Sequence, residues 1–161
     1  METLIIPAGG GKKEIYEAII PQIEAVISGE PDTIANMANV AAILREAFDM
    51  FWVGFYIVKE DSSTHGSSLV LGPFQGPLAC TRIAFGKGVC GASWRDKATL
   101  IVPDVEAFPG HIACSSLSRS EIVVPLIKNG EVTAILDIDS KDLDSFDETD
   151  ASYLKSIVGM L

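Results

Sequence analysis

Residues 121–140 read E-I-V-V-P-L-I-K-N-G-E-V-T-A-I-L-D-I-D-S and carry the clearest hairpin signal of the chain. Two runs rich in valine, isoleucine and leucine flank Asn129-Gly130, a dipeptide that suits the tight type I′ turn between antiparallel strands. We therefore predict one strand over 121–128 and a second over 131–140. We expect the other segments of the chain to pair with this hairpin or to pack on the antiparallel sheet that contains it.

The segments on either side of the hairpin predict the remaining elements. Helical periodicity indicates a helix over 12–27, with a kink or break at Pro21, and a second helix over about 33–48. The aromatic and β-branched run 51–59 predicts a strand that is covered on both faces. The polar stretch 60–68, with His65 near its tip, is expected to be a surface hairpin loop. Three short strands are expected at 69–71, 80–84 and 100–102, and a short helix at 88–96. A closing helix is expected to begin at Asp147 and to end at about residue 158.

This order of elements predicts an α+β fold, with a central antiparallel β-sheet and helices packed mainly on one side. The chain has 161 residues and shows no internal repeat and no linker. We therefore expect a single domain over 1–161, in which 1–12 could form a flexible N-terminal segment.

Charge and hydropathy limit the partners and the compartment. The chain has 12 basic and 22 acidic side chains, a net charge of −10, which disfavours nucleic acid and anionic membrane surfaces as partners. The N-terminus lacks the basic and apolar regions of a signal peptide, and no apolar stretch approaches the roughly 18 residues of a membrane span. We expect a cytoplasmic protein whose thiols are kept reduced.

Three cysteines, Cys80, Cys90 and Cys114, lie in a stretch rich in glycine and proline. An odd number of cysteines argues against a framework of permanent disulfides, so these residues are buried fillers, metal ligands or reactive thiols. Zinc is the weaker alternative, because the three cysteines and His111 lack the C-x-x-C spacing of zinc sites. We expect no metal and no cofactor. If the thiols cooperate, they must meet across loops in space.

Three carboxylates are expected close to these thiols. Asp137 and Asp139 alternate in one strand of the hairpin and so project from the same face. Pairing around the turn places Glu121 near Ile138, between the two aspartates. Such a cluster would bind an ammonium group and keep one acid protonated, because three like charges this close cannot all ionise. The alternative is an ordinary solvated face of the sheet.

Trp52 and Tyr56 project from one face of the strand 51–59, with Gly54 between them. Aromatic side chains at such positions are most often part of a core. As the walls of a pocket, they would instead form a slot for a methyl or thioether group.

Six motifs along the chain together resemble one known family. They are W-V-G-F-Y at 52–56, L-G-P-F-Q-G at 71–76, A-C-T-R-I-A-F-G-K-G-V-C-G at 79–91, F-P-G-H-I-A-C at 108–114, S-E-I-V-V-P at 120–125 and L-D-I-D-S at 136–140. In this order they closely resemble the free methionine-(R)-sulfoxide reductases, a family built on a stand-alone GAF domain. The resemblance covers the chain from about Glu14 to its end.

The resemblance implies a GAF fold and the reduction of free methionine-(R)-sulfoxide, through a cysteine sulfenic acid and an intramolecular disulfide that thioredoxin recycles. It implies that Cys114 is the catalytic cysteine, Cys80 the principal resolving cysteine and Cys90 a third thiol near the entrance loop. The residues that it implies for substrate binding are Trp52, Tyr56, Glu121, Asp137 and Asp139, and Glu121 is our candidate for the acid that protonates the departing oxygen.

Some differences and alternatives stay open at this point. The family usually has aspartate after the catalytic cysteine and asparagine before the pocket tryptophan, where this chain has Ser115 and Phe51. The alternative function is a non-catalytic GAF module that senses a small ligand. Either Cys80 or Cys90 could resolve Cys114. A homodimer through the terminal helices is possible, since GAF domains often dimerise in this way.

Overall fold

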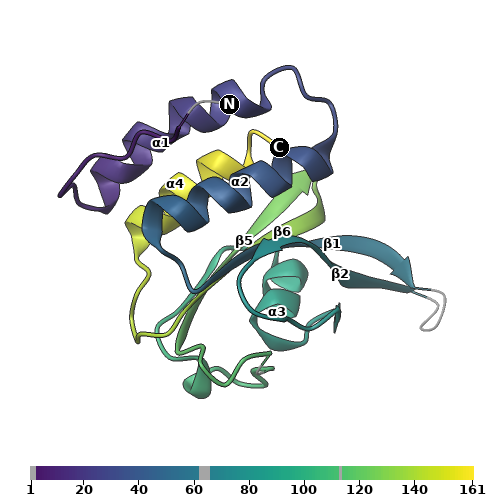
Figure 1. The fold of residues 1–161 in the computed structure, drawn as a ribbon. Coiled ribbons are helices and arrows are strands. Elements are labelled where there is room, and N and C mark those ends of the chain that lie inside the picture. The colour runs from purple at the N-terminus through teal and green to yellow at the C-terminus, as the bar shows by residue number, and fades with distance from the viewer. Residues whose placement is uncertain (1–2, 62–65, 113) are drawn as a thin grey trace.

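The computed structural model describes residues 3–61, 66–112 and 114–161 (Figure 1). A six-stranded sheet and four α-helices make up its framework. In chain order the elements are α1 (Lys12–Ile27), α2 (Thr33–Phe48), β1 (Trp52–Asp61), β2 (Gly66–Gln75), β3 (Arg82–Ala84), α3 (Gly88–Asp96), β4 (Leu100–Val102), a 3₁₀ turn (Val105–Ala107), β5 (Ser120–Lys128), β6 (Glu131–Ser140) and α4 (Glu148–Val158).

Neighbouring strands of the sheet are antiparallel, in the order β3-β2-β1-β6-β5-β4. The predicted hairpin is confirmed as β5 and β6 at the middle of this order. Its turn residues Asn129 and Gly130 both have positive φ angles, 53° and 80°, as a type I′ turn requires. The α+β class with an antiparallel sheet is therefore confirmed.

The register of the hairpin differs by one residue from the prediction. Ile127 lies opposite Val132, but the next residue, Leu126, lies opposite Ala134, so a β-bulge interrupts the ladder. Beyond the bulge Glu121 pairs with Asp139 and not with Ile138. This matters because a slip of one residue moves a side chain to the other face of the sheet. The bulge places Glu121 on the face of the two aspartates.

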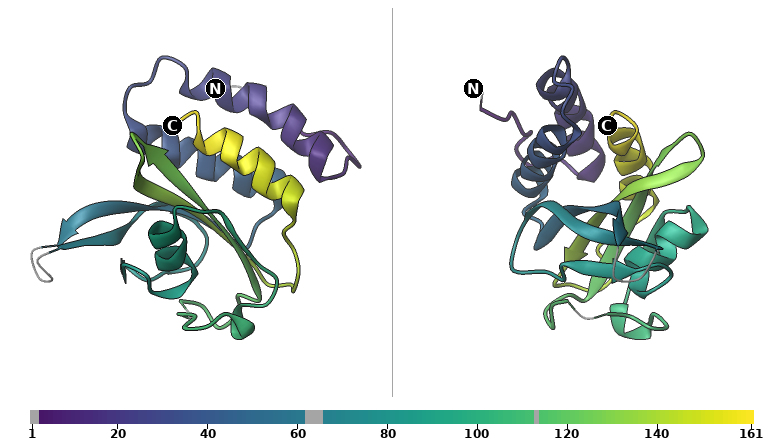
Figure 2. Two further views of the ribbon diagram at one scale, coloured as in Figure 1. Left: turned by 180° about the vertical axis from the view of Figure 1, so that it is seen from behind. Right: turned by 90° about the vertical axis from the view of Figure 1, so that its right-hand side faces the viewer.

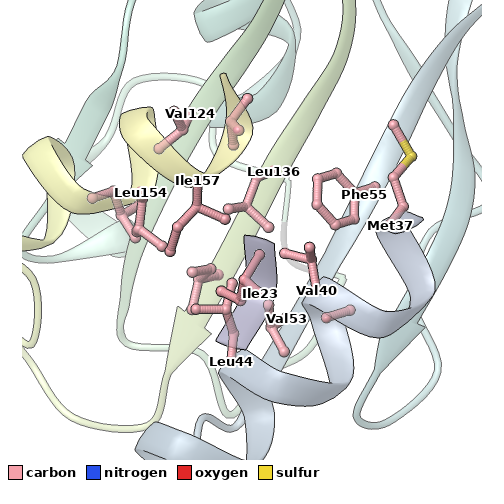
Figure 3. Packing of buried hydrophobic residues seen from close by; sticks show 14 of the residues in the cluster. Ile23, Met37, Val40, Leu44, Val53, Phe55, Val124, Leu136, Leu154 and Ile157 are labelled. Carbon is pink, nitrogen blue, oxygen red and sulfur yellow. The ribbon is translucent and has the colours of Figure 1, made fainter. Parts of the chain in front are cut away.

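One face of the sheet carries the main hydrophobic core. Helices α2 and α4 pack on this face, and α1 packs on these two helices on the side away from the sheet (Figure 1 and Figure 2). Figure 3 shows how the side chains of helices and strands meet between them. The residues labelled there are Ile23, Met37, Val40, Leu44, Val53, Phe55, Val124, Leu136, Leu154 and Ile157, all of them buried.

The opposite face of the sheet carries α3 and a smaller cluster of buried residues. Trp52 and Tyr56 of β1 and Val123 of β5 belong to this cluster, and Cys90 of α3 packs with them. Figure 1 shows α3 on the side of the sheet away from the other three helices. The site described below lies on this second face.

Several details of the helices and of one loop depart from the sequence predictions. The helix α1 continues through Pro21 without a break. Its buried face includes Tyr16, whereas Val26, which belongs to the apolar pattern that predicts this helix, is 45% exposed. Ile34 and Ala38 of α2 are likewise exposed.

The predicted loop 60–68 is shorter than expected, because β1 extends to Asp61 and β2 begins at Gly66. His65 lies outside the described residues. Among the helices that the structure describes, none has the length and apolar character needed to cross a membrane.

The closing helix begins as the sequence predicts. Asp147 caps α4 by accepting hydrogen bonds from the backbone N–H groups of Thr149 and Asp150, and Asp150 completes the capping box. The carboxylate of Asp150 also accepts hydrogen bonds from Tyr16 and from Lys12. These contacts fix α4 against α1, so the helical layer is tied together far from the second face.

Candidate active site

A pocket opens on the face of the sheet that carries α3. Its walls come from the sheet, from the N-terminus of α3 and from two loops, one before β3 and one before β5. The residues that line it include Phe51, Trp52, Tyr56, Leu78, Ala79, Ile83, Lys87, Gly88, Val89, Cys90, His111, Ile112, Cys114, Ser115, Ser118, Glu121, Asp137 and Asp139. Nearly every residue that the sequence singled out therefore lines one pocket.

A disulfide joins the two loops at the edge of this pocket. It links Cys80 and Cys114, which are 34 residues apart in sequence and have their Cα atoms 5.5 Å apart. Cys114 is exposed and Cys80 is half-buried. The chain has no C-x-x-C motif, so two cooperating thiols had to come from different loops. Cys80 and Cys114 do so.

The floor of the pocket is acidic. Glu121 and Asp137 are only 5% and 6% exposed, and Asp139, opposite Glu121, is half-buried. Burial is the largest cause that raises the pKa of each carboxyl group, and the charges of the neighbouring aspartates add to it for Glu121. The pKa of Asp139 rises to about 6, with a hydrogen bond to Ser118 acting in the opposite direction. The floor can therefore hold protons near neutral pH.

One oxygen of this floor has no partner. Asp137 Oδ1 is buried and accepts no hydrogen bond from any residue that the structure describes. A buried carboxylate oxygen without a donor is costly and uncommon in proteins. The arrangement fits a positively charged donor supplied by a ligand.

Cys90 lines the pocket as a buried residue. It is 4% exposed, in the first turn of α3, and its thiol donates a hydrogen bond to Glu121 Oε1 at 3.7 Å. Burial, followed by the charges of Asp137 and Glu121, raises the pKa of this thiol. Cys90 is therefore a buried thiol whose protonated form is favoured.

Trp52 and Tyr56 line the pocket and also hold the loop that carries Cys80. Trp52 Nε1 donates to the carbonyl of Pro77 at 3.1 Å, and the Tyr56 hydroxyl donates to the carbonyl of Cys80 at 2.9 Å. Burial raises the pKa of Tyr56, so its hydroxyl stays a donor. Their rings stack with centroids 6.0 Å apart. The sequence places both on the pocket face but gives no sign of these backbone contacts.

Gly54 makes room for this aromatic wall. A Cβ atom at this position would overlap the side chain of Phe74 and the ring of Trp52. Trp52 therefore lies over its own strand and stacks on Phe74, with ring centroids 5.5 Å apart. The space left by the missing side chain of Gly54 is filled by Trp52.

The two positions at which this chain differs from the family pattern, Phe51 and Ser115, both line the pocket. Sequence reasoning did not identify Lys87, Ile83 and Leu78 as lining residues, although all three lie within a few residues of a cysteine in the glycine-rich stretch. Their closeness to Cys80 and Cys90 along the chain is the signal that could have found them.

The antiparallel sheet, with α1, α2 and α4 on one side and α3 and the pocket on the other, is that of a GAF domain. The GAF domain family matches residues 34–160. The chain is 58% identical to GAF domain-containing protein A of Dictyostelium discoideum, over 94% of this chain and 93% of that protein. It is 39% identical to the free methionine-R-sulfoxide reductase of Saccharomyces cerevisiae, over 93% of this chain and 85% of that protein.

Solved structures give the same assignment. The crystal structure of the free methionine-R-sulfoxide reductase of Neisseria meningitidis in complex with its substrate is 54% identical, covers 99% of this chain and 93% of that chain, and superposes with a TM-score of 0.92. This chain belongs to the free methionine-R-sulfoxide reductase family. The resemblance found in the sequence is thereby confirmed.

Proposed function

We propose that this protein reduces free methionine-(R)-sulfoxide to methionine, with Cys114 as the attacking thiol and Cys80 as the thiol that resolves it. The observation that carries the proposal is the Cys80–Cys114 disulfide beside a pocket whose floor holds Glu121, Asp137 and Asp139. This pairing is the oxidised product that the reaction would leave. The relatives named free methionine-R-sulfoxide reductases support the substrate.

The pocket has groups suited to both ends of this substrate. Asp137, with its unpartnered oxygen, and Asp139 would bind the α-ammonium group, which only a free amino acid presents. Trp52 and Tyr56 would contact the methyl and sulfur end. A methionine sulfoxide residue within a peptide has an amide in place of the ammonium and would leave the aspartates unpaired. The acids therefore select the free amino acid.

The first chemical step transfers the sulfoxide oxygen. The Cys114 thiolate attacks the electrophilic sulfur of the substrate while Glu121 protonates the oxygen. A bond between Cys114 Sγ and the substrate sulfur forms first. This bond and the sulfur–oxygen bond of the substrate then break as the oxygen moves to Cys114 Sγ. The substrate sulfur gains two electrons and leaves as methionine, and Cys114 loses two electrons to become a sulfenic acid. The buried floor suits this step, because it favours the protonated form of Glu121.

The second step forms the disulfide. The Cys80 thiol attacks the sulfenic sulfur of Cys114, the Sγ–Sγ bond forms, and the oxygen leaves as water. A thioredoxin, as an external dithiol, then reduces the disulfide by exchange and is itself oxidised. The exposure of Cys114 in the disulfide supports attack from solvent. No metal and no organic cofactor take part in this scheme.

A coupled assay tests the proposal. Purified protein, thioredoxin, thioredoxin reductase and NADPH are mixed with free methionine-(R)-sulfoxide, with the S epimer, or with an N-acetylated R epimer. The proposal predicts NADPH oxidation only with the free R epimer, and its loss in Cys114→Ser. A structure 42% identical to this chain is that of a putative GAF sensor protein from Burkholderia vietnamiensis. Tight binding of the sulfoxide without turnover would support the sensor alternative and contradict the reductase.

A further inference from the structure

The structure leaves one of the three thiols without a part in the disulfide. Cys90 is buried at the N-terminal turn of α3, while Cys80 and Cys114 are paired at the pocket edge. Its Sγ atom, one oxygen of Glu121 and one oxygen of Asp137 all lie within 4.8 Å of one another. A buried thiol that is packed against two carboxyl groups is poorly placed to exchange with an external dithiol.

The backbone around Cys90 fixes its position. The N–H of Gly86 donates to the carbonyl of Gly91 at 3.0 Å, and the N–H of Gly91 donates to the carbonyl of Lys87 at 2.9 Å. Gly88 has a φ of +60°, a conformation that favours glycine. A Cβ atom on Gly91 would collide with the backbone carbonyl of Ala84. The thiol of Cys90 is therefore held at one place against the floor of the pocket.

We propose that Cys90 is a positioning residue, whose thiol donates to Glu121 Oε1 and so leaves Oε2 as the oxygen that carries the transferable proton. This inference rests on the proposed function, because it assigns a proton donor for that reaction. The Sγ to Oε1 distance is 3.7 Å, within the range of a hydrogen bond from sulfur. In a protonated carboxyl group, the carbonyl oxygen is the stronger acceptor of a hydrogen bond. The proton of Glu121 is then on the other oxygen.

The direction of the effect on Glu121 follows from its surroundings. Burial, the charges of Asp137 and Asp139 and a hydrogen bond with Asp137 raise its pKa, and the hydrogen bond from Cys90 acts in the opposite direction, because a donor stabilises the carboxylate. Cys90 thus makes Glu121 a stronger acid than burial alone would leave it. Besides Glu121, the titratable and charged groups that line this pocket are Cys90, Asp137, Asp139, Tyr56, Lys87, His111 and, in the reduced protein, Cys114.

A matched pair of variants tests this role. Cys90→Ala and Cys90→Ser both remove the sulfur, and they differ only by a hydroxyl group that can donate to Glu121. Reduced protein is mixed with free methionine-(R)-sulfoxide, and the methionine formed in a single turnover is measured across pH. Glu121 must be protonated to act, so the rate falls as the pH rises through its pKa. In Cys90→Ala this alkaline limb should move up by about half a pH unit to one unit, and Cys90→Ser should restore it to near its wild-type position.

A second readout needs no turnover. The infrared carbonyl band of protonated carboxyl groups, compared with Glu121→Gln to isolate Glu121, should titrate at higher pH in Cys90→Ala than in Cys90→Ser. Equal titration in the two variants would overturn the role of Cys90. Normal single turnovers in both variants, with equal loss of recycling, would instead make Cys90 a resolving thiol and also overturn it. If wild-type protein forms no methionine but the infrared shift is seen, the proposed function fails while the hydrogen-bond assignment stands.

Discussion

The hydroxyl of Tyr56 donates a hydrogen bond to the backbone carbonyl of Cys80 at 2.9 Å, from the middle of the sheet to the loop that carries one half of the disulfide. Trp52 makes a parallel contact with Pro77, three residues earlier in the same loop. The two aromatics therefore do more than line the pocket, because they hold the loop in the position at which Cys80 reaches Cys114.

Removal of this hydroxyl in Tyr56→Phe is expected to slow disulfide formation more than methionine formation. The ring that faces the substrate stays, but the Cys80 loop loses a buried hydrogen bond worth about 1 kcal/mol, so resolution should slow about fivefold. The measurement follows methionine and free thiols separately after one equivalent of sulfoxide is added. Tyr153→Phe is the control, since its hydroxyl contacts Glu17 on the helical layer. If methionine formation and disulfide formation slow by the same factor, Tyr56 acts on the substrate alone.

Asp137→Asn tests the ammonium site. The amide keeps the shape of the side chain but not its charge, so KM for free methionine-(R)-sulfoxide should rise about tenfold or more, with a smaller change in kcat. Steady-state kinetics with the thioredoxin system give both constants. Asp142→Asn, at an exposed position after β6, controls for a general loss of negative charge. Unchanged KM in Asp137→Asn would remove this residue from the substrate site.

The acidic floor also predicts how stability depends on pH. A carboxyl group whose pKa is higher in the folded than in the unfolded protein favours folding at low pH, and this contribution is lost as the pH rises through the folded pKa. Asp139, raised to about 6, and Glu121 and Asp137, raised well above their usual range, all act in this direction. As the pH rises from 5 to 8, the free energy of unfolding should therefore fall.

Glu121→Gln removes one of these groups. Its free energy of unfolding should fall less between pH 5 and pH 8 than that of the wild type, by about 1 kcal/mol or more, as one pKa unit corresponds to about 1.4 kcal/mol. Urea denaturation of the oxidised proteins at the two pH values measures this difference, again with Asp142→Asn as the control. A larger fall in Glu121→Gln than in the wild type would contradict the raised pKa of Glu121.

Gly54→Ala tests the packing of the aromatic wall. The added methyl group would overlap Phe74 and the ring of Trp52, so the free energy of unfolding should fall by roughly 1–3 kcal/mol. Because Trp52 also anchors the Cys80 loop, recycling should slow as well. Urea denaturation and the coupled assay measure the two effects. The same substitution in a Phe74→Gly background, which removes the Cβ atom that the new methyl group meets, should cost less, and an equal cost there would show that the clash lies elsewhere.

Local patterns predicted most of the elements but not how they meet. The turn at Asn129-Gly130, the cap at Asp147 and the short helix around Cys90 follow from rules that involve only nearby residues, and the structure confirms them. The register of Glu121 was wrong by one residue, because a β-bulge between Leu126 and Ile127 leaves no clear mark in an apolar strand.

The site shows the same division. The alternation of Asp137 and Asp139 places both on one face, and Glu121 joins them once the bulge is known. The pairing of Cys80 with Cys114 came only from the family resemblance, since spacing alone left Cys90 equally open. Contacts such as that of Tyr56 with the Cys80 carbonyl depend on the path of a loop 24 residues away, which no local pattern encodes.

The order of roles among the thiols is tested most directly in Cys80→Ser. Reduced Cys80→Ser protein is given excess free methionine-(R)-sulfoxide without thioredoxin, and methionine and the sulfenic acid are measured together, the latter with a sulfenic-acid reagent and peptide mass mapping. The account predicts one methionine per chain, a label on Cys114 and slow recycling when thioredoxin is added. A label on Cys90, or a steady-state rate equal to that of the wild type, would contradict it.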